Sequence, residues 1–449
     1  MKRAEVCGGA GSEVIPPVLE LHTGLLGMEA AALGVLTLLL GALVLLVVLA
    51  LGRRKDAETG ADLTVPEETS AVKPSAVKKQ KQEKTQRRSK DKNSQHTFSH
   101  PLLAATLKAH NGNVTCLDFS SNGKYLASCA DDRTVRIWST KDFTEREHKC
   151  LRANVELDHA VLVRFSPDSR AFITWLENGD TIRIFKMVKK EDGTLTFKAS
   201  AEDFPPKHKA SIINIGIAET GKFIMSASAD TTIHIWDLRG EILATLNTNQ
   251  VTTSYAAVSP CGRFVASCGF TPDVKVWEVC FAFDLKGHSA GVHAFAFSND
   301  SHRMATVSKD GTWKLWNTDV EYRKQQDPYL LKTVSCSSSE GSRVALTPDG
   351  RVLALSDGTD VFLFNCESGE LEERLSAVHS CPLTDLRFDT SGLFLACSGD
   401  RAVRVLHNAP GHRAAIAHHN ALLRTAQSEA MRTDSSSRWR RPRERWTSC

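Results

Sequence analysis

The feature that most constrains this 449-residue chain is a set of four side chains that recurs at fixed spacing. Between Leu126 and Trp138 a hydroxyl, a carboxylate and an indole follow in the order S-x-x-x-D-x-x-x-x-x-W, with a histidine upstream. The complete sets are His110, Ser128, Asp132 and Trp138; His208, Ser226, Asp230 and Trp236; and His288, Thr306, Asp310 and Trp316. A buried indole N–H and a buried hydroxyl both need partners, and a histidine that bridges the hydroxyl to the carboxylate supplies them. The pattern therefore predicts a buried hydrogen-bonded tetrad in each of three structural units.

Four further segments keep the register of this pattern but replace some of its members. One keeps Ser267 and Trp277, with Thr271 at the carboxylate position, and the last keeps His379 and Asp400. The seven positions equivalent to the indole are Trp138, Phe185, Trp236, Trp277, Trp316, Phe364 and Leu406. A period of roughly 40 to 45 residues is that of a propeller blade. The predicted fold is therefore all-β, a seven-bladed β-propeller over residues 101–408.

The segment before the first tetrad is too short to form a further blade. It has the length of one strand, about Leu102 to Leu107. A strand there would pair with the last blade and close the ring, which protects the sheet edges. We therefore expect this strand to belong to the seventh blade.

A long apolar stretch precedes the repeats. Residues 30–52 form a run of 23 residues without a charge, and at about 1.5 Å per residue this reaches the ~30 Å hydrocarbon thickness of a bilayer. A secretory signal peptide is the alternative, but its apolar region has about 7 to 15 residues and its charged end comes first. Here Arg53, Arg54 and Lys55 follow the run. The length of the apolar run predicts a transmembrane helix over 30–52. The positive-inside bias then predicts a short lumenal amino terminus over 1–29 and a cytosolic remainder.

Residues 53–100 read as a basic linker. They lack apolar periodicity and are rich in Lys, Gln, Ser, Glu and Thr, so we expect them to be disordered. The whole chain has a formal net charge of only +4, but nine basic residues against two acidic ones gather between Lys73 and Lys92. The candidates for RNA or lipid contact are Lys78, Lys79, Lys81, Lys84, Arg87, Arg88, Lys90 and Lys92. Anionic lipid head groups and RNA phosphates both suit such a run, and a solvated spacer is the alternative.

A Ser, His and Asp set in several blades could be mistaken for a catalytic triad. A nucleophile must lie exposed beside an oxyanion site, whereas here an indole would cap the network inside a packed blade. The sequence contains no G-x-S-x-G, Walker A, G-x-G-x-x-G or H-E-x-x-H motif, and no Cys-x-x-Cys or Cys/His zinc spacing. We therefore expect no enzymatic activity, cofactor, metal or small-molecule substrate. The cysteines at Cys129, Cys268 and Cys397 follow the hydroxyl position of a blade, which favours reduced, structural thiols.

Basic residues stand two positions before five of the seven anchors. They are Arg136, Arg183, Lys275, Lys314 and Arg404. Because side chains alternate along a strand, these residues share the anchor's face and could form a rim that binds an acidic peptide or RNA. The alternative is that their alkyl stems pack while the charged heads reach solvent.

Residues 409–449 form the carboxyl tail. NAPGH at 408–412 predicts a turn, and residues 413–432 have a helix-forming composition. The final residues are basic, with Trp439 and Trp446 between arginines. Arginine and tryptophan can stack on bases or lie at a membrane interface. We expect the tail to be partly helical and then disordered.

Several strings are more specific than the generic blade pattern. KYLASCADDRTVRIWSTKDF, VASCGFTPDVKVWEVCF and SKDGTWKLWNTDVEY, together with the apolar span and the lysine-rich linker, resemble the membrane-anchored transducin beta-like family of WD-repeat proteins. The resemblance covers residues 30–408. It implies an endoplasmic reticulum membrane protein whose propeller faces the cytosol. It also implies association with the stress-sensing kinase that phosphorylates translation initiation factor two, and contact with messenger RNA or ribosomes during the unfolded protein response.

These observations predict a non-enzymatic scaffold or adaptor, because propellers present loops around a ring and usually bind other proteins. Two alternatives stay open. The first is a substrate receptor of a cullin ubiquitin ligase, because Trp236, Asp237 and Arg239 resemble the W-D-x-R box that docks on the damage-specific DNA-binding adaptor. The second is an RNA-binding protein that acts through the basic linker.

Overall fold

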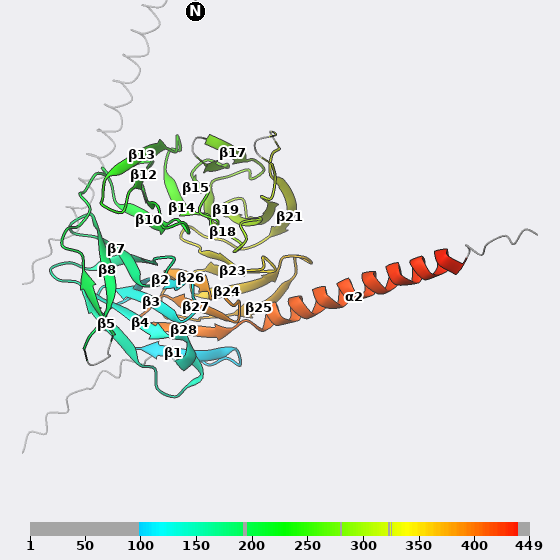
Figure 1. The fold of residues 1–449 in the computed structure, drawn as a ribbon, viewed down its shortest axis with the longest axis horizontal. Coiled ribbons are helices and arrows are strands. Elements are labelled where there is room, and N and C mark those ends of the chain that lie inside the picture. The colour runs from blue at the N-terminus through cyan, green and yellow to red at the C-terminus, as the bar shows by residue number, and fades with distance from the viewer. Residues whose placement is uncertain (1–97, 192–194, 279–280, 322–323, 325, 439–449) are drawn as a thin grey trace, which may run out of the picture. The chain divides into compact units, whose positions relative to one another are not determined.

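Seven four-stranded antiparallel sheets are arranged as the blades of a ring (Figure 1). The computed structural model describes residues 98–438, apart from 192–194, 279–280, 322–323 and 325. The predicted seven-bladed all-β fold is confirmed.

Numbered in chain order, the blades consist of the following strands. Blade 1 has β2 (Val114–Phe119), β3 (Tyr125–Ala130), β4 (Thr134–Ser139) and β5 (Cys150–Asn154), and blade 2 has β6 (Ala160–Phe165), β7 (Ala171–Leu176), β8 (Thr181–Lys189) and β9 (Leu195–Ala199). Blade 3 has β10 (Ile212–Ile217), β11 (Ile224–Ser228), β12 (Thr232–Trp236) and β13 (Ile242–Asn247), and blade 4 has β14 (Thr253–Val258), β15 (Val265–Gly269), β16 (Val274–Trp277) and β17 (Phe281–Leu285). Blade 5 has β18 (Val292–Phe297), β19 (Arg303–Ser308), β20 (Thr312–Asn317) and β21 (Tyr329–Ser335), and blade 6 has β22 (Val344–Leu346), β23 (Val352–Asp357), β24 (Asp360–Asn365) and β25 (Leu371–Leu375).

Blade 7 joins the two ends of the propeller. Its first three strands are β26 (Asp385–Phe388), β27 (Phe394–Ser398) and β28 (Ala402–His407), and its outer strand is β1 (Leu103–Lys108) from the start of the domain. Leu107 of β1 pairs with Val403 of β28. The predicted closing strand is therefore confirmed, one residue further along the chain than expected. Because β1 completes the last sheet, its pairing with β28 joins the start of the domain to its end and closes the ring.

A second pattern recurs in the turn between the first two strands of a blade. A serine or threonine there donates a hydrogen bond to an aspartate two residues later. Ser298 Oγ donates to Asp300 Oδ1 at 2.5 Å, and Thr347 Oγ1 donates to Asp349 Oδ1 at 2.7 Å. Ser301 then adopts a φ of 61° to complete its turn. Its hydroxyl accepts a bond of 2.9 Å from the backbone N–H of Cys261 in blade 4. The turns thus also fix one blade against the next.

The hydrophobic core lies between neighbouring blades. One cluster combines Ile137 of blade 1 with Val163 and Phe172 of blade 2, all of them buried. Strands buried on both faces read as nearly continuous apolar runs, which explains why β3, β11 and β23 contain so few charged residues. Each blade therefore needs both neighbours to bury its two faces, as expected for a repeat architecture.

The tail begins with a helix directly after the last strand. Helix α2 (Ala409–Arg438) starts where a turn was predicted at 408–412, so that prediction was wrong. Asn408 caps the helix by accepting a bond of 3.0 Å from the Gly411 N–H, and Pro410 lies in the first turn, where proline costs no helical hydrogen bond. Arg413 then pairs with Glu372 of blade 6 at 3.0 Å. Figure 1 shows the rest of α2 extending away from the ring.

Some sequence predictions concern residues outside the described ranges. The amino terminus (1–29), the apolar run (30–52), the linker up to residue 97 and the tryptophans at the end of the tail all lie there. Within the described residues, no helix combines the length and apolar character that crossing a bilayer requires. Besides the strands and α2, a short 3-10 helix, η1 (Thr140–Thr144), follows β4.

Candidate functional site

The structure brings together all twelve side chains of the three predicted tetrads. In blade 5, Trp316 Nε1 donates to Thr306 Oγ1 at 2.9 Å, Thr306 Oγ1 lies 2.7 Å from His288 Nε2, and His288 Nδ1 lies 2.8 Å from Asp310 Oδ2. Blade 1 repeats this chain of bonds through Trp138, Ser128, His110 and Asp132 at 2.9, 2.8 and 3.1 Å. Blade 3 repeats the first two bonds through Trp236, Ser226 and His208 at 2.8 and 2.7 Å. There His208 Nδ1 bonds to Thr232 Oγ1 at 3.1 Å and lies 3.5 Å from Asp230 Oδ2.

The chemistry of the groups sets the direction of each hydrogen bond. An ionised carboxylate only accepts, so the histidine Nδ1 must carry the proton and Nε2 must accept one from the hydroxyl. The hydroxyl oxygen is then free to accept the indole N–H. Burial, followed by the neighbouring His234, lowers the pKa of His208 to about 4, so the imidazole is neutral near pH 7. The pKa of Asp310 lies at about 2, because hydrogen bonds from Thr312 and His288 outweigh the cost of its burial.

Each tetrad contains a fifth member that the sequence analysis did not include. Thr312 Oγ1 donates to Asp310 Oδ1 at 2.6 Å, and Thr134 and Thr232 make equivalent bonds of 2.6 and 2.5 Å. A threonine two residues after each tetrad aspartate was the signal that could have revealed it. The second oxygen of Asp310 accepts the backbone N–H of Ser289 at 3.1 Å. The aspartate therefore ties two loops of the blade together.

Blade 4 replaces the charged pair of the tetrad with neutral groups. Gln250 occupies the histidine position, where Ser267 Oγ donates to Gln250 Oε1 at 3.4 Å and Gln250 Nε2 donates to Thr271 Oγ1 at 3.2 Å. Sequence spacing missed Gln250 because it precedes Ser267 by 17 residues, whereas His288 precedes Thr306 by 18. A search that tolerated a one-residue deletion and an amide in place of imidazole would have found it.

The predicted basic rim does not form. Arg183 makes two bonds to Asp203, at 2.8 and 2.6 Å, and Lys314 donates to Thr333 Oγ1 at 2.9 Å. Arg404 is buried in blade 7, where it bonds to His379 and reaches Asp400 at 3.1 Å. The partners come from different places: Thr333 lies in the fourth strand β21, Asp203 follows the fourth strand β9, and His379 and Asp400 lie in loops of blade 7. Arg183, Lys314 and Arg404 therefore meet protein partners instead of solvent.

The inner strands of all seven blades line a central channel with uneven walls. The residue before the last one of each inner strand is Asp118, Arg164, Gly216, Ala257, Ala296, Ala345 or Arg387 in blades 1 to 7. Three charged side chains thus come from blades 7, 1 and 2, and only small ones from blades 3 to 6. The small residues leave two cavities, of about 270 Å³ beside the charged wall and about 170 Å³ beside blades 5 and 6.

The polar side of the channel is a belt of bonds that cross blade boundaries. Asp385 Oδ2 of blade 7 accepts the backbone N–H of Leu117 in blade 1 at 3.0 Å. Arg164 of blade 2 donates to Cys116 Sγ at 3.0 Å and to Asn214 Oδ1 of blade 3 at 2.8 Å. Burial opposes the charge of Asp385, but Arg387 and Arg164 hold the pKa of its carboxyl below the ordinary value. Together these bonds connect blades 7, 1, 2 and 3 around the channel.

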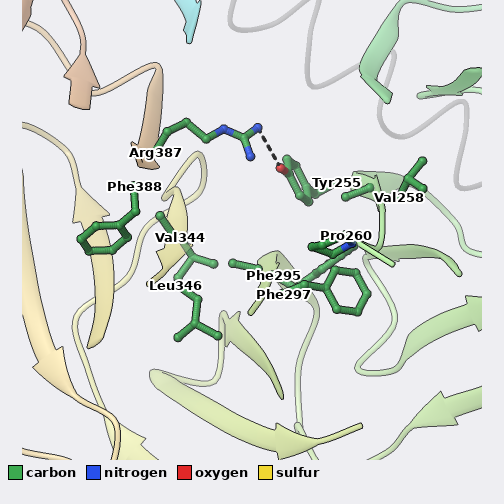
Figure 2. Close-up of a pocket in the computed structure, with 12 residues that line it drawn as sticks. Tyr255, Val258, Pro260, Phe295, Phe297, Val344, Leu346, Arg387 and Phe388 are labelled. Carbon is green, nitrogen blue, oxygen red and sulfur yellow. Dashed lines mark hydrogen bonds between the residues drawn. The ribbon is translucent and has the colours of Figure 1, made fainter. Parts of the chain in front are cut away.

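Arg387 reaches across the channel and separates the two cavities. Its Nη2 donates to the hydroxyl of Tyr255 in blade 4 at 3.4 Å, as Figure 2 shows. Its Nε is buried and has no hydrogen-bond partner among the described residues. Asp385 lies 3.5 Å from that nitrogen, but the oxygen concerned already accepts the Leu386 N–H at 2.9 Å. Arg387 is therefore the least satisfied cation of the channel, which sequence reasoning did not single out.

Comparison with known proteins agrees with this architecture. The family described as WD domain, G-beta repeat matches residues 102–139, 204–237, 280–317 and 373–406. Transducin beta-like protein 2 of Mus musculus is 62% identical over 411 residues, covering 88% of this chain and 92% of the relative. The protein of the same name from Homo sapiens is 63% identical over 374 residues, covering 80% and 83%. This chain belongs to the transducin beta-like protein 2 family. The four matched segments end in blades 1, 3, 5 and 7, the blades that contain the histidine and the aspartate.

The W-D-x-R segment of this family member runs from a buried tryptophan to an exposed arginine. Trp236 is buried in its tetrad, and Asp237 Oδ1 accepts the N–H groups of Arg239 and Glu241 at 2.9 and 2.8 Å to shape the turn before β13. Arg239 itself is exposed. The candidate basic residues Lys78, Lys79, Lys81, Lys84, Arg87, Arg88, Lys90 and Lys92 lie outside the described residues.

The described residues contain no cluster of ligating side chains that could hold a metal ion. Their nine cysteines are free, and Cys129, Cys268 and Cys397 are buried among apolar side chains. Burial raises the pKa of Cys268 far above its ordinary value and that of Cys397 to about 12, so both thiols stay protonated. These thiols act as small apolar residues between the blades.

Proposed function

We propose that this protein is a membrane-tethered scaffold whose propeller binds protein partners on the cytosolic side of the endoplasmic reticulum. Membership of a WD-repeat family, whose propellers are typically non-enzymatic scaffolds, supports binding as the activity. The observation that carries the proposal is that the hydroxyl, imidazole and carboxylate of each tetrad bond to one another and to an indole inside a blade. Such groups hold a rigid ring together, and the ring presents loops and a channel to partners.

The partners that we propose follow from the family resemblance. They are the stress-sensing kinase that phosphorylates translation initiation factor two, and the translation machinery or its messenger RNA, during the unfolded protein response. The apolar run at 30–52 would hold the propeller at the membrane, and the basic run at 73–92 would lie close to lipid or RNA phosphates.

Proximity labelling from the native membrane tests the scaffold. The full chain, a chain without the propeller and a chain without residues 73–92 would each carry the labelling enzyme. We expect the kinase and translation factors to be labelled by the full chain during stress and to be lost without the propeller. Equal labelling with and without the propeller would contradict the proposal. Loss of RNA crosslinks on removal of 73–92, with protein labelling retained, would assign RNA contact to the linker.

Glycosylation tests the proposed orientation. Asn113 and Asn299 begin N-x-S/T sequons, and both side chains are exposed. A propeller in the lumen would present these acceptors to the glycosylation machinery, whereas a cytosolic one would not. We expect the chain from cells to keep its mass after endoglycosidase treatment. A mass decrease that disappears in Asn299→Gln would place the propeller in the lumen and overturn the proposal.

A second candidate function rests on the exposure of Arg239. If the chain is a substrate receptor of a cullin ligase, the adaptor should co-purify with it and be lost in Arg239→Ala. Arg263→Ala, which removes another exposed arginine, is the matched control. Co-purification that is absent, or equal in both variants, would exclude docking through this box.

A further inference from the structure

The unsatisfied state of Arg387 points to a missing anionic partner. A guanidinium carries five N–H donors, and buried polar groups are almost always paired. Within the described residues, Arg387 makes one hydrogen bond, of 3.4 Å to Tyr255, and its buried Nε has none, although Asp385 Oδ1 lies 3.5 Å from it. The length of the bond to Tyr255 is at the limit for an N–H···O bond, so the bond contributes little. A carboxylate that entered between Arg387 and Tyr255 would accept from both groups.

Two arginines and two aspartates share the charged side of the channel. Arg164, Arg387 and Asp118 line the larger cavity, and Asp385 Oδ1 lies 3.5 Å from Arg387 Nε. Asp385 is held in its ionised form, whereas burial raises the pKa of Asp118 and favours its neutral form.

The two cavities that meet at Arg387 differ in chemistry. The larger is lined by Asp118, Arg164 and Asn214 and opens beside the turn residues Ser121, Pro167 and Asn299. The smaller is walled by apolar residues, among them Phe297, Leu346 and Phe388 (Figure 2). A ligand that bridges them needs a carboxylate and a neighbouring apolar group. Each cavity is below the roughly 300 Å³ at which small-molecule pockets begin, so each accepts a single side chain.

We propose that the channel binds protein partners through a carboxylate, with its charge on Arg387 and Tyr255 and an adjacent apolar side chain against Phe297, Leu346 and Phe388. The carboxylate comes from an acidic side chain or from a chain end. It enters from the face that carries the turns between the first and second strands. This inference rests on the proposed scaffold function and names the chemistry by which the ring recognises a partner.

Short peptide probes test the proposal on the full chain in detergent micelles by ligand-observed NMR. The probes are acetyl-Leu-Glu-amide, acetyl-Gln-Leu with a free terminal carboxylate, acetyl-Leu-Gln-amide as the uncharged control, and acetate. We expect at least one carboxylate peptide to bind at least about tenfold more tightly than the uncharged control, as for a hydrogen bond to a charged group. Which of the two binds identifies the source. Failure of both, or binding of acetate as tight as that of the peptides, overturns the proposal.

Variants assign the binding to Arg387 and to the cavities. Arg387→Gln should weaken the binding of the carboxylate probe at least about tenfold, and Arg387→Lys should weaken it less because the charge remains. Arg263→Gln, which removes an exposed arginine of blade 4, should leave binding unchanged. Ala257→Leu fills the cavity while Arg387 stays intact, so it should also weaken binding at least about tenfold. Thermal unfolding of each variant separates lost binding from lost folding, and wild-type affinity in folded Arg387→Gln or folded Ala257→Leu overturns the proposal.

Proximity labelling with the Arg387→Gln chain keeps this inference separate from the scaffold function. Partners that are labelled by the wild-type chain and lost with this variant support the carboxylate site. Partners that persist with it leave the scaffold standing and overturn the site. A wild-type chain that labels no partner contradicts the scaffold itself.

Discussion

Blades 4 and 5 are neighbours with the same strand order, but they hold their loops by different chemistry. In blade 5, His288 and Asp310 form a charge-assisted pair at 2.8 Å, and His288 meets Thr306 at 2.7 Å. In blade 4, Gln250 makes neutral bonds of 3.2 and 3.4 Å at the equivalent positions. Hydrogen bonds to charged groups are shorter and roughly twice as strong as neutral ones. The comparison teaches that the fold needs a bridge at this place, and that the charged tetrad is its stronger form.

The largest effect is expected from the indole of blade 5. Trp316→Ala removes a buried aromatic side chain and leaves Thr306 without its N–H donor, so the free energy of unfolding should fall by about 3 to 5 kcal/mol. Urea unfolding of the full chain would measure this loss. Leu238→Ala, at an exposed site, should change stability by less than about 0.5 kcal/mol. A loss below about 1 kcal/mol in Trp316→Ala would show that the indole does not hold the blade.

Acid should weaken the charged tetrads and spare the neutral bridge of blade 4. The pKa of His208 falls from 6.5 to about 4 on folding, so below pH 6.5 the unfolded chain binds a proton that the folded chain does not. Stability is therefore full above pH 6.5 and decreases as the pH falls towards 4, by up to about 3 kcal/mol for this histidine. His208→Gln, which copies the amide of blade 4, should flatten that part of the curve. An unchanged dependence of stability on pH in this variant would show that His208 does not cause the loss of stability in acid.

Removing the charge of one tetrad aspartate should have an intermediate effect. Asp310→Asn keeps the shape but weakens the bonds to His288, Thr312 and Ser289. We expect a loss of about 2 kcal/mol, in the range for hydrogen bonds to charged groups. Asp319→Asn, at an exposed position of the same blade, is the control and should be nearly silent. Equal losses at the two positions would mean that the tetrad charge has no special role.

The smallest effect is expected at the neutral bridge. Gln250→Ala removes three neutral bonds, two of 3.2 Å and one of 3.4 Å, and should cost about 1 kcal/mol, less than His288→Ala in the neighbouring blade. Chemical denaturation of both variants under one condition would measure the difference. A larger loss in Gln250→Ala would reverse the ranking of the two blades.

The fold could be predicted from the repeat pattern because each tetrad member has one physical role and stands at a fixed spacing. Seven anchors and a closing strand followed from that pattern, whereas Gln250 escaped it through a one-residue deletion. The basic rim does not form because Lys314 bonds to Thr333 of the fourth strand and Arg183 bonds to Asp203 in the loop after it, and the sequence does not show these contacts. The channel site was out of reach for another reason. Arg387 and Tyr255 are 132 residues apart, and only closure of the ring brings them face to face.

Closure of the ring by β1 is the claim on which the channel and the scaffold both depend, and hydrogen exchange on the full chain tests it most directly. Residues 103–108 pair with 402–407 in one sheet, and the His407 N–H donates to the Leu102 carbonyl at 2.7 Å. We predict that peptides from these two segments are both protected, with exchange rates within about tenfold of each other. Exchange of 103–108 at the rate of an unstructured chain, with 402–407 still protected, would contradict the closed ring.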